Sequence, residues 1–102
     1  MFESTKFRVL EIIIANRNKG FNAQRVALMR DLPELSWEEI SDYILLLKLE
    51  GYVTVLFGDN EICAIALQRG AIARVREMHE AADNKQLKEL FCRILDLLKI
   101  SL

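Results

Sequence analysis

The sequence predicts a mostly α-helical domain with one small β-hairpin, an α+β fold. Apolar residues recur at three- and four-residue spacings through most of the chain, which is typical of amphipathic helices. One run of β-branched and aromatic residues, 52–57, precedes the turn sequence Gly-Asp-Asn and a second apolar run, 61–67, a pattern that indicates a hairpin. The length of 102 residues suits a single domain with a substantial core.

The first helix is expected at residues 4–18. Phe7, Leu10 and Ile14 form its main apolar stripe, and Gly20 is a suitable stop. Further apolar residues widen the arc, namely Val9, Ile12 and Ile13. This helix is therefore expected to pack on more than one side.

A short second helix is expected at 23–30, with Asn22 as its N-cap and the segment 31–35 after it. The third helix begins after Ser36, because Ser36 and Glu39 have the spacing of a capping box. Its core stripe consists of Trp37, Ile40, Ile44 and Leu47, with Tyr43 beside them. Gly51 is expected to end it in the left-handed conformation.

Two helices follow the hairpin. One covers 71–82, with Ile72, Val75 and either Met78 or His79 facing inward. The last covers about 85–100, after a weak capping signal from Asp83 and Gln86. One wide arc of the last helix is apolar and contains Leu87, Leu90, Phe91, Ile94, Leu95, Leu97 and Leu98. We thus expect a domain at 1–82 and a C-terminal helix at 83–102 for packing or dimerisation.

The stretches "ISDYILLLKLEGYV", "GDNEI" and "IALQRG", in the order helix, helix, helix, hairpin, helix, resemble the winged-helix family of helix-turn-helix domains, as in small bacterial or phage-type regulators. The resemblance covers roughly residues 4–80. It implies that the third helix enters the major groove of DNA and that the hairpin tip touches the backbone. The positions implied are Ser36, Glu38, Glu39, Ser41, Asp42 and Leu45 on the helix, and Asp59, Asn60 and Glu61 on the tip.

The charge pattern departs from that family. Residues 31–61 hold eight acidic side chains and one basic one, Lys48, whereas DNA affinity comes from lysine and arginine at phosphates. The acids at the implied DNA-reading positions are Glu38, Glu39, Asp42, Asp59 and Glu61. They form either a solvated, helix-capping face or a surface for a basic protein partner. The cations that would serve DNA instead are Arg25, Arg30 and Lys48.

Three leucines of the third helix lie off its core stripe. Leu46 is expected to be covered by the hairpin, whereas Leu45 and Leu49 stack on one outer face. Three alternatives are open: the last helix folds back over that pair, the pair lies in a partner or dimer interface, or the two leucines are simply exposed, as single surface leucines often are. A two-fold homodimer is favoured, and its predicted interface consists of Val9, Ile12, Ile13, Leu45, Leu49, Leu87, Leu90, Phe91, Ile94, Leu97 and Leu98.

No catalytic, metal-binding or cofactor-binding constellation is found in the sequence. His79 lacks a second ligand at metal-binding spacing, Cys63 is expected in the core, and Cys92 is expected to be accessible but without a base beside it. No apolar run approaches the length of a membrane span, and the N-terminus does not resemble a signal peptide. We therefore expect a cytoplasmic, non-enzymatic regulatory or adaptor module acting through protein contacts and self-association. The alternative is a transcriptional regulator that binds duplex DNA.

Overall fold

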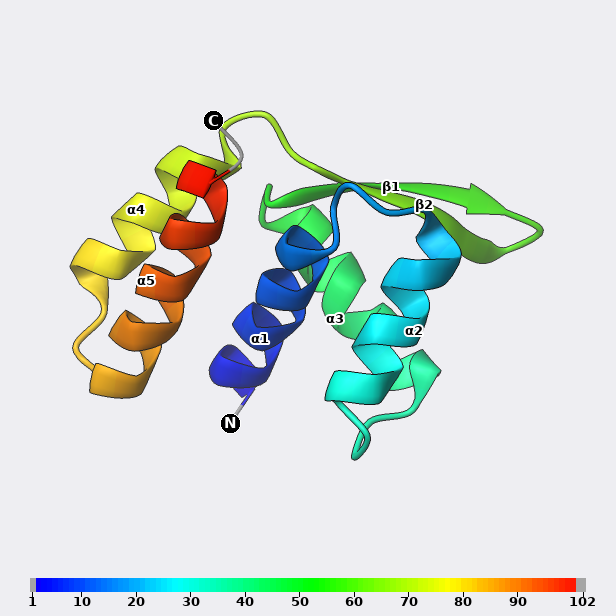
Figure 1. Ribbon diagram of the computed structural model, residues 1–102, viewed down its shortest axis with the longest axis horizontal. Helices are drawn as coiled ribbons and strands as arrows, with labels where there is room; N and C mark the ends of the chain where they lie inside the picture. The colour runs from blue at the N-terminus through cyan, green and yellow to red at the C-terminus, as the bar shows by residue number, and fades with distance from the viewer. Residues whose placement is uncertain (1, 101–102) are drawn as a thin grey trace.

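The computed structural model describes residues 2–100, with side chains from 3 to 99. In chain order the elements are α1 (Phe2–Ala15), α2 (Phe21–Asp31), α3 (Trp37–Leu49), β1 (Val53–Gly58), β2 (Glu61–Leu67), α4 (Ala71–Ala81) and α5 (Lys85–Ile100). This order confirms the predicted fold class, mostly α with one antiparallel hairpin and a helix at the C-terminal end (Figure 1). The last two residues of the predicted C-terminal segment lie outside the described residues.

Side-chain caps mark the starts of α3 and α5. At the start of α3 the Ser36 hydroxyl accepts from the backbone N–H of Glu39, and the Glu39 carboxylate accepts from the backbone N–H of Ser36, which confirms the capping box. Two predicted caps are wrong. Gly20, not Asn22, is the N-cap of α2, and before α5 it is the Asn84 side chain that accepts from the backbone of Gln86 and Leu87.

The hairpin has a tight turn and one irregularity. Asp59 and Asn60 have φ angles of 53° and 66°, the two positive values that a two-residue turn of type I′ requires. Leu56 pairs with Ala64 and Phe57 with Ile62, so Cys63 is an extra, unpaired residue. This bulge lets both Ile62 and Ile65 face the core and leaves Cys63 exposed. The expectation that Cys63 is a core residue is therefore wrong.

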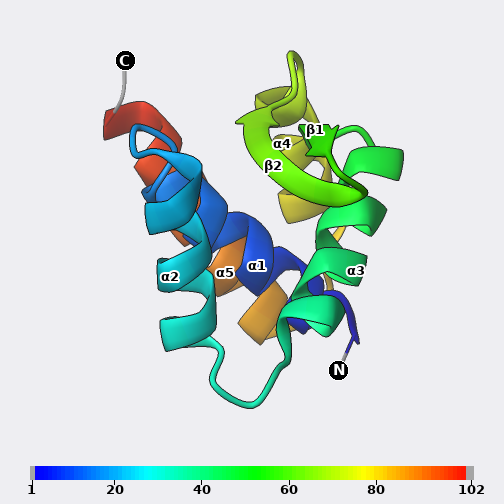
Figure 2. The ribbon, with the colours of Figure 1, turned by 90° about the vertical axis from the view of Figure 1, so that its right-hand side faces the viewer.

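Helix α1 is the central element of the molecule. It packs against α2, α3 and α5, and Figures 1 and 2 show it between α5 on one side and α2 and α3 on the other. The Phe7 ring meets Tyr52 and Phe91 edge-on, with ring centres 5.4 Å and 4.7 Å apart. One continuous hydrophobic core thus joins the three-helix segment, the hairpin and the two last helices.

Burial within one chain corrects most of the predicted dimer interface. On α1 the three extra apolar residues Val9, Ile12 and Ile13 are at most 3% exposed. On α5 the residues Leu90, Phe91, Ile94 and Leu98 are buried, and Leu87 and Leu97 are half-buried. The apolar arc of α5 is satisfied by α1 and α4. These side chains stabilise the fold and are not available as an exposed interface.

Polar contacts fix α5 and the end of α3 on α1. The Glu11 carboxylate, which is buried, accepts from Arg8 and from Arg93 of α5, each at 2.8 Å. Gly51 ends α3 with φ 87°, a conformation that glycine adopts at low cost.

Among the described residues, no helix is both long enough and apolar enough to cross a membrane.

Candidate functional site

A groove of about 400 Å³ lies between α3 and the hairpin. Its apolar surface comes from Trp37, Leu45 and Phe57, and its acidic surface from Glu38, Asp42 and Glu61. The structure therefore brings together one of the predicted interface leucines and three members of the predicted acidic set. The groove occupies the place where the winged-helix resemblance implies contact with a nucleic acid.

Local structure explains how each element contributes to the groove. Once the capping box starts α3, Glu38, Asp42 and Leu45 follow at spacings of four and three and share one helix face. On β1, Phe57 points to the same side as the buried Val55, two residues earlier, but lies beyond the end of the core. Its ring is consequently 50% exposed. The sequence pattern had not singled out Phe57, although alternation along β1 places it on this side.

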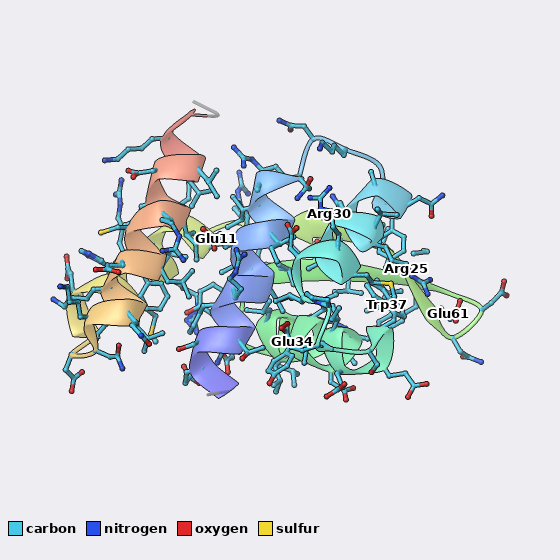
Figure 3. The ribbon with its side chains drawn as sticks, turned by 60° about the horizontal axis from the view of Figure 1, so that its bottom comes forward. Glu11, Arg25, Arg30, Glu34, Trp37 and Glu61 are labelled. Carbon is cyan, nitrogen blue, oxygen red and sulfur yellow. The ribbon has the colours of Figure 1, made fainter. Side chains whose placement is uncertain are left out.

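Two cations flank the groove on aromatic rings. The Arg25 guanidinium lies 4.5 Å from the Trp37 ring centre, and the Lys48 ammonium lies 5.5 Å from the Phe57 ring centre. Figure 3 shows Arg25 beside Trp37, with Glu61 on the neighbouring hairpin. Arg30, the third cation predicted to serve nucleic acid, pairs instead with the adjacent Asp31 carboxylate at 2.9 Å. Its hydrogen bond lowers the pKa of the Asp31 carboxyl below the ordinary value.

The acids of this face have few charged partners. Among residues 3–99, Glu38, Asp42, Asp59 and Glu61 form no ion pair. Glu39 differs from them because its carboxylate is engaged in the capping box. The result is a group of carboxylates around the groove that form no ion pair with the rest of the described chain.

The leucines of α3 are not covered by the rest of the chain. Leu49 is 80% exposed and Leu46 is 43% exposed, so the expectation that the hairpin buries Leu46 is wrong. Leu45 is half-buried at the groove. Helix α5 lies on the other side of α1 (Figure 1) and does not shield any of the three. The outer face of α3 is thus acidic along its first half and apolar along its second.

A second cluster of chemical interest lies on α4 and α5, outside the groove. The Cys92 sulfur and the His79 Nε2 atom are 3.2 Å apart, which corrects the expectation that nothing pairs Cys92 with a base. The thirteen-residue separation gave no periodic signal, because the two residues belong to different helices. The described residues contain no group of three or more potential metal ligands.

Protein-family models, curated proteins and solved structures gave no match to this chain. What the molecule itself defines is a mostly α-helical fold with a hairpin and an apolar, acidic groove beside it. The resemblance to winged-helix domains rests on the element order and on the residues around Gly51.

Proposed function

We propose that this protein is a non-enzymatic regulatory or adaptor module on a winged-helix-like frame that binds another protein through α3 and the hairpin. The partner segment is basic and apolar. The observation that carries the proposal is the groove itself, where Leu45 and Phe57 are partly exposed among carboxylates without ion pairs. Exposed large apolar side chains surrounded by polar ones are typical of protein interaction sites.

The two kinds of side chain have different roles in this proposal. Burial of Leu49 and Phe57, which are 80% and 50% exposed in the free chain, supplies affinity by removing apolar surface from water. The carboxylates of Glu38, Asp42 and Glu61 attract a basic partner and orient it. Because this charge attraction is screened by ions, binding should weaken as salt concentration rises.

Self-association is the other form of protein contact that this module would make. With α1 and α5 covered, the face of α3 around Leu46 and Leu49 is the part of the predicted interface that stays open to a second copy. A two-fold pairing in which the two α3 helices run parallel brings the Glu38 and Asp42 carboxylates of the copies toward each other. Such a homodimer should therefore tighten as salt screens the repulsion, the opposite of the salt response of a basic partner.

Duplex DNA is the second candidate ligand, and one observation favours it. Arg25 and Lys48 hold their charges against aromatic rings on the two sides of the groove, positions from which they would reach phosphates. Two cations supply little of the phosphate neutralisation that DNA binding requires. We accordingly rank protein binding first.

The test is a titration of the isotope-labelled chain with synthetic peptides, followed by NMR. A leucine- and lysine-containing amphipathic peptide should shift the resonances of Leu45, Leu49 and Phe57, whereas a peptide with glutamate in place of lysine should not. Leu49→Ser should weaken the binding. The matched control is Val26→Ser, because Val26 is also an exposed apolar residue, 63% accessible, but belongs to α2 and not to α3 or the hairpin.

The outcomes separate the candidate functions. Peptide binding that is insensitive to both charge reversal of the peptide and Leu49→Ser would overturn the proposal. Saturable binding of random duplex DNA near physiological salt, measured by fluorescence anisotropy, would replace it by the nucleic-acid alternative. Sedimentation at low and high salt tests the homodimer. A dimer that becomes tighter at high salt would support self-association through α3, and a chain that stays monomeric at both would contradict it.

A further inference from the structure

We propose that Cys92 is a reactive thiol, activated by His79, that exchanges with small disulfides to form a mixed disulfide on the surface of the molecule. This inference is independent of the groove and of its partner. Helices α4 and α5 pack side by side, as Figure 1 shows, and the pairing brings the Cys92 sulfur to 3.2 Å from His79 Nε2. The site is a modification site for disulfide-containing or other electrophilic small molecules.

The chemistry follows from the pairing of a thiol with a base. The thiolate, not the thiol, attacks electrophiles, and a neighbouring imidazole activates a thiol by taking its proton. With the ring proton on Nδ1, the Nε2 atom of His79 accepts the hydrogen bond of the thiol. Proton transfer along that bond then leaves a thiolate beside an imidazolium, two opposite charges that stabilise each other.

Packing holds the base in place while the sulfur stays accessible. His79 is half-buried on α4, and Cys92 is exposed on α5. The charged residues three or four positions from Cys92 along α5 are Lys88, Glu89 and Asp96, and none of them hydrogen-bonds to its sulfur among residues 3–99. The guanidinium of the adjacent Arg93 is engaged with Glu11 at 2.8 Å. The imidazole is therefore the group placed to change the charge of the sulfur.

The proposed reaction is thiol–disulfide exchange with a low-molecular-weight disulfide as oxidant. The Cys92 thiolate attacks one sulfur of the disulfide, a new sulfur–sulfur bond forms, and the old one breaks. The second half of the reagent leaves as a thiolate and takes up the proton that His79 had accepted. One protein thiol is oxidised to the mixed disulfide, and one half of the reagent is reduced to a thiol.

The chain contains its own reference thiol. Cys63 is also exposed, at the bulge of β2, but among residues 3–99 no side chain hydrogen-bonds to its sulfur. Both thiols belong to exposed residues, and only Cys92 has an imidazole beside it among the described residues. Their relative rates thus measure the effect of the histidine.

The experiment treats the native chain near neutral pH with iodoacetamide and, separately, with oxidised glutathione, and follows each cysteine by peptide mass spectrometry. We expect Cys92 to react about tenfold faster than Cys63, because the His79 imidazole beside it can take the proton of the attacking thiol. In a Cys63→Ser background, His79→Gln should bring the reaction rate of Cys92 down to about the rate that Cys63 has in the native chain. Glutamine keeps a polar side chain of similar reach but has no basic nitrogen.

Two results would overturn the inference. One is a Cys92 rate equal to or below that of Cys63 in the native chain, and the other is an unchanged Cys92 rate in a folded His79→Gln variant. Circular dichroism establishes whether that variant folds. If the variant does not fold, the unsubstituted chain is measured with and without urea. A rate difference between the two thiols that disappears in urea is caused by the folded contact between Cys92 and His79. A difference that persists in urea is not caused by that contact and overturns the inference.

Discussion

The buried ammonium group of Lys6 joins α1 to the end of α3. Its Nζ atom donates to the two Glu50 carboxylate oxygens at 2.7 Å and 3.0 Å and to Glu3 at 3.0 Å. Arg74 of α4 donates in turn to the Glu50 backbone carbonyl at 2.7 Å. Burial alone would lower the pKa of Lys6, but the hydrogen bonds to Glu50 and Glu3 outweigh it and raise the pKa above the ordinary lysine value.

Truncation of Glu50 should therefore leave the Lys6 charge poorly compensated. We expect Glu50→Ala to lower the free energy of unfolding by about 2 kcal/mol, a usual loss for a hydrogen-bonded charged group. Urea denaturation measures it. The matched control is Glu80→Ala, which removes an exposed carboxylate of α4 that has no ion pair among the described residues. Equal, small effects of both substitutions would contradict this assignment.

The same contact predicts a pH dependence. A lysine whose pKa is higher in the folded chain stabilises the fold fully at a pH below its unfolded pKa, and this stabilisation is lost as the pH rises through the folded pKa. The unsubstituted chain should therefore lose stability in the alkaline range more steeply than Glu50→Ala. Denaturation curves collected at increasing alkaline pH would show parallel losses if Lys6 had no such role.

At the scale of elements, α5 shows what periodicity predicts and what it leaves open. The apolar arc of α5 was predicted from the sequence, and the structure buries Leu90, Phe91, Ile94 and Leu98. Periodicity predicts that one face of a helix is buried. It does not predict which surface buries that face, because this depends on the path of the chain between elements. Because α4 packs on α5 and α5 on α1, the arc is covered from within, and the predicted interface on it was wrong.

Because of this burial, truncation of two aliphatic residues should have very different effects on the free energy of unfolding. Ile94→Ala should lower the free energy of unfolding by about 2–5 kcal/mol, because it leaves a cavity in the core. Leu49→Ala should change it by no more than about 0.5 kcal/mol, since that side chain is exposed. Urea denaturation of both variants is the measurement. A harmless Ile94→Ala would mean that α5 does not pack as described.

Strands and turns show why other features escaped the sequence. The hairpin and its turn at Asp59 and Asn60 were predicted from residue type, since both features depend on neighbours along the chain. The bulge at Cys63 was not, because one unpaired residue arises from the register between two strands. The same limit applies to the groove. Capping and helical spacing predict that acids of α3 share one face. They do not predict that Phe57 lies near Leu45, because that depends on how the hairpin packs against the helix.

Across the whole molecule, the groove and the last two helices lie at opposite ends of the long axis. The groove and its acids lie at the hairpin end, and α4 and α5 form the other end (Figure 1). If the frame presents α3 to ligands as winged-helix domains present theirs to DNA, we expect the acids of α3 and the hairpin to weaken DNA binding.

Charge reversal at the groove tests that idea. Each change of an acid to lysine adds two charges, so Glu38→Lys, Asp42→Lys and Glu61→Lys together move the net charge from −1 to +5. We expect this triple variant to bind random duplex DNA with an affinity that falls steeply as salt concentration rises, because cations at phosphates release counterions. Fluorescence anisotropy at several salt concentrations is the measurement.

The matched control carries the same net charge at the other end of the molecule, with Glu77→Lys, Glu80→Lys and Glu89→Lys on α4 and α5. It should bind DNA more weakly than the groove variant, because its new cations do not converge on one concave surface with Arg25 and Lys48. Equal binding by the two variants would show that net charge alone decides and that the groove has no special relation to DNA. Binding by neither would mean that the frame, and not the acids, keeps DNA away.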